Sequence, residues 1–188
     1  MNRKFWTTLG IIIGVFLILA VMTVSQYNRP ITMKEAVDAQ WAQVENQLKR
    51  RYDLIPNLVE TVKGYAAHEQ EVFLGVAKAR EAYFSAKGSD GRAKAANELE
   101  TALSRLLLLQ ERYPQLKANE NFLRLQDSLE GTENRISVER RRYNDQVRAL
   151  NTYVKTFPGI LFAKIAGIGP HGYFEVLEEQ QNVPKVKF

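Results

Sequence analysis

The sequence of 188 residues contains no cysteine and only two histidines, and both scarcities restrict its chemistry. Without cysteine there is no disulfide framework, no thiolate nucleophile and no cysteine metal site. The histidines, His68 and His171, stand far apart. The sequence after His68 does not complete an H-E-x-x-H motif, because the fifth position is Val72. We therefore predict no metal site.

Other signatures of chemistry are also missing. No glycine-rich loop joins a strand to a helix, so no phosphate cradle is visible, and no serine stands in a nucleophile motif. The formal net charge of +5 is a mild excess, which does not indicate a nucleic-acid partner. No sustained period-two alternation predicts strands. We therefore predict an all-α protein that is not an enzyme, with no catalytic residues and no cofactor.

The most apolar stretch lies near the amino terminus. Residues 5–24 carry no charge, and 20 helical residues span about 30 Å, the thickness of a bilayer core. Trp6 and Tyr27 flank this run at positions typical of membrane interfaces. The alternative is a cleaved signal peptide, for which residues 20–22 are a poor cleavage site. We predict that residues 1–27 form a single transmembrane anchor.

Two features of this anchor leave alternatives open. Arg3 and Lys4 on one side nearly balance Arg29 and Lys34 on the other, so the charge rule only weakly favours a domain outside the cytoplasm. The other feature is a G-x-x-x-G motif formed by Gly10 and Gly14. It either lets two membrane helices associate closely or reflects the tolerance of lipid for glycine.

The longest periodic pattern lies in the second half of the chain, from Leu116 to Phe157. Positions on one helical face recur every three or four residues for about 40 residues, which corresponds to a helix roughly 60 Å long. Such a helix needs antiparallel neighbours or other copies of the chain to cover its apolar stripe. The stripe positions are Phe122, Leu125, Leu129, Thr132, Ile136, Glu139, Tyr143, Val147, Leu150, Val154 and Phe157.

The first half of the bundle is harder to divide. We expect Asn28–Pro30 to break the membrane helix and Thr32–Glu35 to cap the next one. The apolar phase continues across Pro56 and Gly64, which favours one kinked helix to about Ala86. A turn near residues 64–69 would instead create a separate helix. A glycine-rich turn at 87–91 then predicts an antiparallel helix over 92–112, with Leu106–Leu109 widening its apolar surface.

These patterns predict three segments. Residues 28–159 form an elongated antiparallel bundle of three to four long helices after the anchor. Residues 160–188 form a tail that packs on the bundle or a partner, with strand-like ends at 173–175 and 183–188. The apolar part, residues 160–168, is too short to span a membrane. It either plugs the open end of the bundle or contacts lipid or a second subunit.

Charged residues suggest two further features. Glu139 on the apolar stripe can pair with Arg135 or Arg142, and with Thr132 these residues would form a polar layer that fixes helix register. A binding or catalytic site there, or a local outward rotation of the helix face, are the alternatives. Basic triplets suggest solvated faces or contacts to anionic headgroups or an acidic partner; they are Lys49, Arg50 and Arg51, and Arg140, Arg141 and Arg142.

Four runs of sequence strongly resemble the LemA family. They are QLKRRYDLIPNLVETVKGYAAHE (47–69), YPQLKANENFLRLQDSLEGTENRI (113–136), RRYNDQVRALNTYVKTFPG (141–159) and the closing VPKVKF, and Tyr27-Asn28 also matches the family pattern. The resemblance implies a bacterial inner-membrane protein with an amino-terminal single-pass anchor and a four-helix bundle. It implies no established enzymatic activity or cofactor, and it suggests a link to membrane organisation or to a membrane metalloprotease.

The sequence therefore predicts a non-enzymatic, membrane-anchored helical scaffold that forms homo-oligomers, docks a membrane protein, or does both. The alternative function is a lipid-engaging module that organises or remodels membranes through its basic triplets and residues 160–168. An enzyme with its site between Thr132 and Asn144 is a third hypothesis. The lipid bilayer is the common partner in the first two, and the process served is left open.

Overall fold

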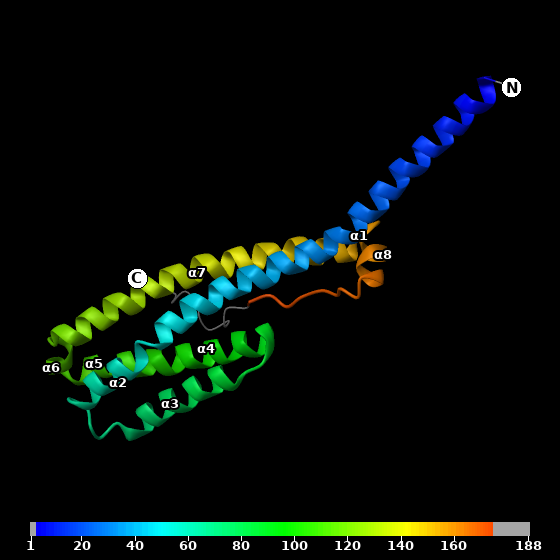
Figure 1. Ribbon diagram of the computed structural model, residues 1–188. Coiled ribbons are helices and arrows are strands. Elements are labelled where there is room, and N and C mark those ends of the chain that lie inside the picture. Colours follow the sequence, from blue (N-terminus) through cyan, green and yellow to red (C-terminus); the bar gives the residue numbers. More distant parts are fainter. Residues whose placement is uncertain (1–2, 175–188) are drawn as a thin grey trace, which may run out of the picture. The chain divides into compact units, whose positions relative to one another are not determined.

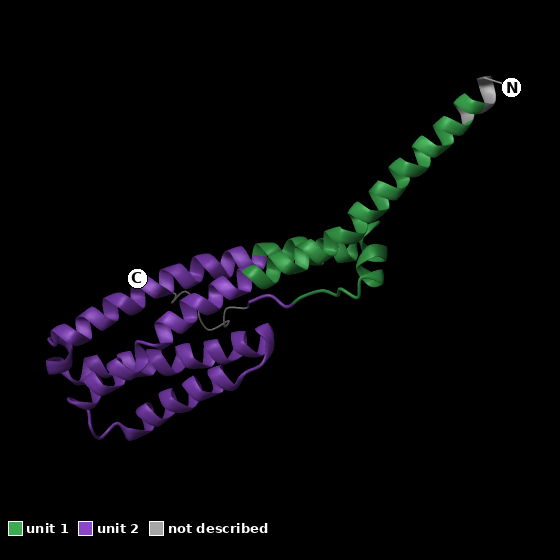
Figure 2. Ribbon diagram, in the orientation of Figure 1, with its two compact units in different colours: residues 1–39, 145–171 green, residues 40–144, 172–188 purple. Residues whose placement is uncertain are grey.

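The computed structural model describes residues 3–174, apart from the side chains of residues 3–5 and 8 (Figure 1). These residues form helices and connecting segments without any strand, which confirms the predicted all-α class. The chain divides into two compact units (Figure 2). Unit 1 combines residues 1–39 with 145–171, and unit 2 combines residues 40–144 with 172–188.

The elements follow one another in a simple order. The helices are α1 (Arg3–Tyr52), α2 (Ile55–Lys63), α3 (Gln70–Ser85), α4 (Gly88–Leu107), α5 (Leu109–Arg112), α6 (Pro114–Lys117), α7 (Glu120–Lys155) and α8 (Gly159–Ile165). The division between the units falls inside α1 and inside α7, so each unit contains part of both long helices.

In unit 1, α1 continues through Asn28–Pro30, so the predicted break and the capping box after it are wrong. The reason is a donor from α7, which is distant in sequence. A proline at position 30 cannot donate to the carbonyl of residue 26, four residues earlier. The hydroxyl of Tyr153 lies 3.0 Å from that Gln26 carbonyl oxygen and supplies the missing donor. Thr32, the predicted cap, instead donates from Oγ1 to the Asn28 carbonyl at 3.2 Å inside the helix.

In unit 2, the favoured single helix to Ala86 is also wrong. Helix α1 ends at Tyr52, α2 begins at Ile55 with Pro56 in its first turn, and α3 begins only at Gln70. Pro56 suits a helix start, where its missing donor costs nothing. The apolar phase continued across both breaks because it records which face meets the core, and not whether the backbone is continuous.

The hairpin of α3 and α4 follows the prediction more closely. Gly88 has φ +72°, a conformation that favours glycine, and it turns the chain between Ser85 and the start of α4. Helix α4 begins four residues earlier than the expected 92. The two helices pack against one another in antiparallel directions (Figure 1). Leu106 and Leu109 are buried, whereas Leu108 is exposed.

Helix α7 confirms the long periodic stripe. It begins at Glu120, where the Asn119 side chain accepts a hydrogen bond from the Phe122 backbone at 3.0 Å and caps the first turn. The stripe positions are buried with three exceptions: Leu125 and Glu139 are half-buried, and Phe157 is exposed. Among the strand-like tail residues, Tyr173 and Phe174 lie in an irregular segment, and 175 and 183–188 lie outside the described residues.

The buried core of unit 2 is large and mostly aliphatic, with aromatic rings among the branched chains. Its fully buried large side chains come from six helices: Leu48, Tyr52, Ile55, Leu58, Leu99, Leu103, Leu106, Leu109, Leu116, Phe122, Ile136 and Tyr143. Unit 1 is different, because the apolar residues of its N-terminal helix are exposed. This helix is long and apolar enough to cross a membrane, and none of its most apolar stretch is buried.

Candidate functional site

The most unusual feature of unit 2 is a charged cluster in its helical core. Arg51 on α1 is 7% exposed, and its Nη2 lies 2.7 Å from Glu100 Oε2 on α4. Its Nη1 pairs with Glu133 on α7. One arginine thus connects three helices. We call Arg51, Glu100 and Glu133 the core charge cluster.

The electrostatics of this cluster are dominated by burial. Burial raises the pKa of Glu100 above its ordinary value, and the positive charge of Arg51 opposes this effect without overcoming it. The negative charge of Glu133 raises the pKa of Glu100 further, and Arg140 lowers it. The ion pair therefore does not repay the full cost of placing the Glu100 carboxylate in the core.

Several polar atoms around the core charge cluster have no hydrogen-bond partner among the residues that the structure describes. They are Oε1 of Glu100, Nε of Arg51, Oη of Tyr52, and Nε and Nη2 of Arg140. Burial also raises the pKa of the Tyr52 hydroxyl, so this group stays neutral at physiological pH. Burying polar groups without partners costs free energy, so these atoms do not add to the stability of the core.

The predicted polar layer on α7 is only partly assembled. Both carboxylate oxygens of Glu139 are engaged: Oε2 accepts from Gln40 Nε2 at 2.6 Å, and Oε1 accepts from Arg142 Nη1 at 2.8 Å. Thr132 is buried and donates to the Leu129 carbonyl at 2.8 Å. Arg135 is exposed. Glu139 therefore links α1 and α7 within unit 2, and Thr132 satisfies its own helix.

The two basic triplets are less uniform than predicted. Lys49 and Arg50 are exposed, but Arg51 is buried in the core charge cluster and cannot reach a headgroup or an acidic partner. In the second triplet, Arg141 and Arg142 are exposed. Arg140 is half-buried, and its guanidinium lies 4.3 Å from the centre of the Phe174 ring. A triplet on a helix cannot present all three charges to one surface, because successive residues point about 100° apart.

Two asparagines of α7 hold the segment that follows α8. In unit 2, Asn144 accepts from the Phe174 backbone at 2.8 Å and donates to its carbonyl at 3.0 Å. In unit 1, Asn151 makes the same pair of bonds to His171, at 2.8 and 2.9 Å. The amide side chain imitates a peptide group, so each asparagine satisfies one backbone donor and one acceptor. We call Asn144 and Asn151 the backbone clamps.

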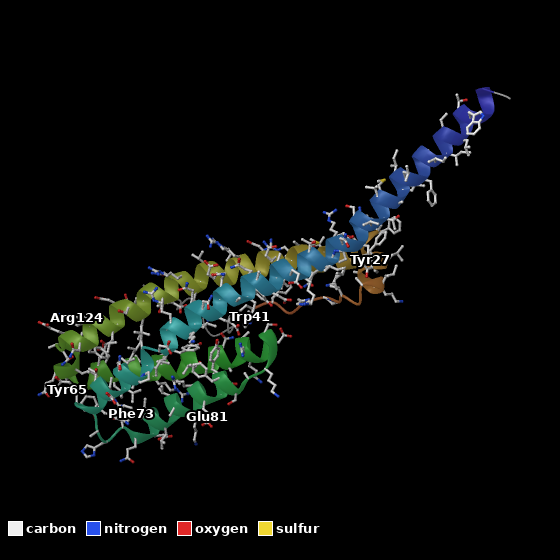
Figure 3. The ribbon with its side chains drawn as sticks, viewed as in Figure 1. Tyr27, Trp41, Tyr65, Phe73, Glu81 and Arg124 are labelled. Atoms are coloured by element: carbon white, nitrogen blue, oxygen red, sulfur yellow. The ribbon has the colours of Figure 1, made fainter. Side chains whose placement is uncertain are left out.

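An aromatic cluster in unit 2 accompanies the Asn144 clamp. Trp41 lies edge-on to Tyr143 with ring centres 5.3 Å apart, and its ring centre is 5.9 Å from that of Phe174 (Figure 3). The Tyr143 hydroxyl donates to the Gly172 carbonyl at 3.2 Å. Trp41, Tyr143 and Phe174 thus seal the tail against α1 and α7 within this unit.

The groove between α3 and α4 and the surroundings of His68 do not have the features of an active site. A shallow groove between α3 and α4 has a mixed lining that includes Glu71, Gly75, Lys94 and Arg105. Among residues 3–174, no three histidines, aspartates or glutamates gather where they could hold a metal ion. His68 is exposed, and its neighbour Glu69 accepts hydrogen bonds from Arg112 and Tyr113 at 3.1 Å each.

Sequence reasoning missed the core charge cluster and the backbone clamps. A signal for the cluster exists, because Arg51 follows Leu48 by three residues and Glu100 precedes Leu103 by three, which places both charges on apolar faces. The clamps gave a weaker signal. Asn144 and Asn151 are seven residues apart on one helical face, but asparagines at that spacing are equally common on exposed helix surfaces.

The arrangement defines a helical protein with an exposed, apolar amino-terminal helix, a closed helical core and no recognisable catalytic constellation in the described residues. A model of the LemA family matches residues 40–188. The chain belongs to the LemA family. This confirms the resemblance inferred from its sequence runs.

The chain is also similar to proteins of magnetic bacteria. It is 26% identical to the magnetosome protein MamQ of Magnetospirillum gryphiswaldense, over 86% of this chain and 70% of that protein. It is also 26% identical to the magnetosome proteins MamQ 1 and MamQ 2 of Paramagnetospirillum magneticum, over 80% of this chain and 65% of each of them. Together with the apolar helix, these relatives fit a membrane-associated bacterial protein.

Proposed function

We propose that this chain is a non-enzymatic scaffold, anchored in the bacterial inner membrane by one transmembrane helix, that self-associates and docks another membrane protein. The observation that carries the proposal is the exposed apolar stretch of α1, which continues as one helix into residues that pack within unit 1. Transmembrane helices need about 20 apolar residues, and residues 5–24 supply them.

The G-x-x-x-G motif supports self-association. A side-chain carbon added at Gly10 or Gly14 would meet nothing within 4 Å, so both glycines present open backbone surface. Small residues at this spacing allow two helices in lipid to approach closely. The membrane partner would be reached through the same helix or through the bundle, and the family resemblance suggests a membrane metalloprotease.

Cross-linking of the full chain in native membranes tests the proposal. We expect a species above the monomer, and we expect Gly14→Ile to lower its yield because a branched side chain separates the helices. Gly131→Ile is the matched control, because Gly131 is a helical glycine that, like Gly14, has nothing within 4 Å of an added side-chain carbon. A strict monomer that co-purifies with no other protein would contradict the scaffold function.

The same membranes test the topology. Because the chain has no cysteine, a single Glu81→Cys variant, placed on the exposed surface of α3, can be labelled specifically (Figure 3). A membrane-impermeant maleimide should label it in intact spheroplasts if the bundle faces outward, as the charge balance weakly favours. Labelling only after lysis would place the bundle in the cytoplasm.

A lipid-engaging module is the second candidate function. Lys49, Arg50, Arg141 and Arg142 are exposed cations that could contact anionic headgroups. Full-length protein reconstituted in one population of vesicles should then cluster anionic vesicles, with an effect that weakens as salt rises. Unchanged clustering after substitution of these four residues by alanine would count against this candidate.

The non-enzymatic part of the proposal rests on the engagement of Glu139. A general acid or base needs a carboxylate that can reach a substrate, and both oxygens of Glu139 are occupied by Gln40 and Arg142. We expect Glu139→Gln to complement a deletion strain as well as the wild type does. Loss of complementation with normal protein abundance would revive the enzyme hypothesis.

A further inference from the structure

The short helix α8 in unit 1 has its small residues inside, Phe162 half-buried and its other large apolar residues outside. Gly159 and Ala163 are buried, whereas Ile160, Leu161 and Ile165 are 47%, 54% and 71% exposed. Phe157, just before the helix, is 81% exposed. This is the reverse of a helix that covers a core.

Both ends of the loop that carries α8 are fixed to the last turns of α7. At its start, a side-chain carbon at Gly159 would collide with the carbonyl oxygen of Tyr153, so only glycine allows the chain to turn back so tightly. At its end, the Asn151 clamp holds the backbone of His171. The outward apolar face of α8 is therefore a built feature of unit 1.

The end of α8 is equally well defined. Gly167 has φ +69°, and the Ile168 backbone donates to the Ala163 carbonyl at 2.9 Å. Together with the bond from Gly167 to the Lys164 carbonyl at 3.2 Å, this is a Schellman motif that closes the helix. The helix is about 10 Å long, too short to cross a bilayer.

The position of α8 along α1 is set by Tyr153. The Tyr153 hydroxyl lies 3.0 Å from the backbone oxygen of Gln26, and the Arg29 guanidinium lies 5.2 Å from the centre of its ring. Gln26 follows the apolar run by only two residues. The turn into α8 thus lies beside the point where α1 leaves its apolar stretch (Figure 1).

We propose that α8 and Phe157 lie in the headgroup boundary of the same bilayer that α1 crosses, as a second membrane contact beside the span. The inference rests on the proposed anchoring of α1. The outward apolar face of α8 contacts lipid, because this face adjoins the membrane-spanning surface of the same unit. The exposed cations Lys155 and Lys164 can extend toward anionic headgroups while the large apolar side chains enter the acyl region.

Spin labels on the cysteine-free full chain test this inference in vesicles of phosphatidylethanolamine and phosphatidylglycerol. Single variants Leu161→Cys and Ile165→Cys carry a nitroxide, and its collisions with oxygen and with a water-soluble nickel chelate are compared. Leu17→Cys reports the span. Leu74→Cys is the matched control, because Leu74 is 59% exposed on α3 of unit 2.

We expect labels at 161 and 165 to collide with nickel several-fold less often than the label at 74, and to report a shallower depth than the label at 17. Nickel access equal to that at 74 would overturn the inference, since α8 would lie in water. Exclusion of both oxygen and nickel would also overturn it, because a second copy or another protein would then cover α8. Nickel access at 17 would instead show that the anchor itself has failed.

Discussion

Units 1 and 2 both violate the usual separation of apolar inside from charged outside, but in opposite ways. Unit 2 buries Arg51 among aliphatic side chains, where it pairs with Glu100 and with the half-buried Glu133, whereas unit 1 exposes long apolar surfaces on α1 and α8. The charges of unit 2 find partners within the chain. The exposed apolar residues of α1 and α8 do not, and large exposed apolar patches of this kind mark contact sites. The contrast separates a unit that packs mainly on its own helices from one whose exposed apolar surfaces fit the proposed contact with lipid.

The largest expected effect comes from charging the apolar face of unit 1. Ile13→Arg with Leu17→Arg should release the chain from the membrane fraction, since two charges near the centre of a bilayer cost about 5–7 kcal/mol. Leu74→Arg with Leu108→Arg is the matched control, because Leu74 on α3 and Leu108 between α4 and α5 are exposed in unit 2. Carbonate extraction measures retention. Equal release by both pairs would remove the distinction between the units.

The next largest effect should come from breaking the core charge cluster of unit 2. Arg51→Met leaves Glu100 buried without its partner, and breaking a buried pair costs about 3–5 kcal/mol. Arg50→Met is the matched control, because the adjacent side chain is exposed and should change stability by less than about 0.5 kcal/mol. Denaturant unfolding in detergent measures both variants. Equal stability of the Arg51→Met and Arg50→Met variants would mean that the core charge cluster contributes no more to stability than an exposed arginine does.

A smaller effect should follow from removing a backbone clamp. Asn144→Ala leaves the donor and acceptor of Phe174 without their partner, at a cost of about 1–3 kcal/mol. Hydrogen exchange should then show a faster amide at Phe174, with protection in α4 unchanged. Uniform loss of protection throughout unit 2 would show that Asn144 supports the whole core and not the tail alone.

Removing the donor that compensates Pro30 should have a comparable but more local effect in unit 1. Tyr153→Phe takes away the hydroxyl that reaches the Gln26 carbonyl, at a cost of about 1 kcal/mol. Pro30→Ala in the same background restores a backbone donor and should recover the loss. No recovery would indicate that the hydroxyl serves another purpose.

The smallest effect concerns pH. Because the folded pKa of Glu100 is raised, its ionisation opposes folding, and this penalty is fully present above the folded pKa. As pH falls through the folded pKa toward the unfolded value of about 4.3, the penalty disappears. Wild-type stability should therefore rise over this window relative to Glu100→Gln. A constant difference between the two proteins across the window would contradict the raised pKa.

The sequence was most informative where periodicity alone decides the structure. The stripe from Phe122 to Val154 predicted α7, and the turn at 87–91 predicted the hairpin of α3 and α4. Helix ends were less predictable. The break at Tyr52 and the continuity through Pro30 depend on what neighbouring segments donate, and Tyr153 lies 127 residues from its acceptor Gln26 in sequence. Local patterns do not contain that information.

The candidate sites differ in the same way: pairs within one helix could be predicted, and contacts between helices could not. Glu139 and Arg142 do pair, as their spacing of three residues predicted. The basic neighbours of Arg51 predict a surface position, but the structure places it in the core, where it pairs with Glu100 on another helix. Which face of a helix is buried can be inferred from its apolar residues, but the partner of a charge that lies on that face comes from tertiary packing.

The unbroken course of α1 past Pro30 has a mechanical consequence. Residues 25–39 continue the apolar segment as helix for about 20 Å, at 1.5 Å per residue, with Pro30 inside the helix. A non-helical link would allow the apolar segment to move independently of the residues that follow it. If the apolar segment crosses a membrane as proposed, a rotation of that segment about its own axis, such as pairing at Gly10 and Gly14 would impose, also turns the helical residues that follow it.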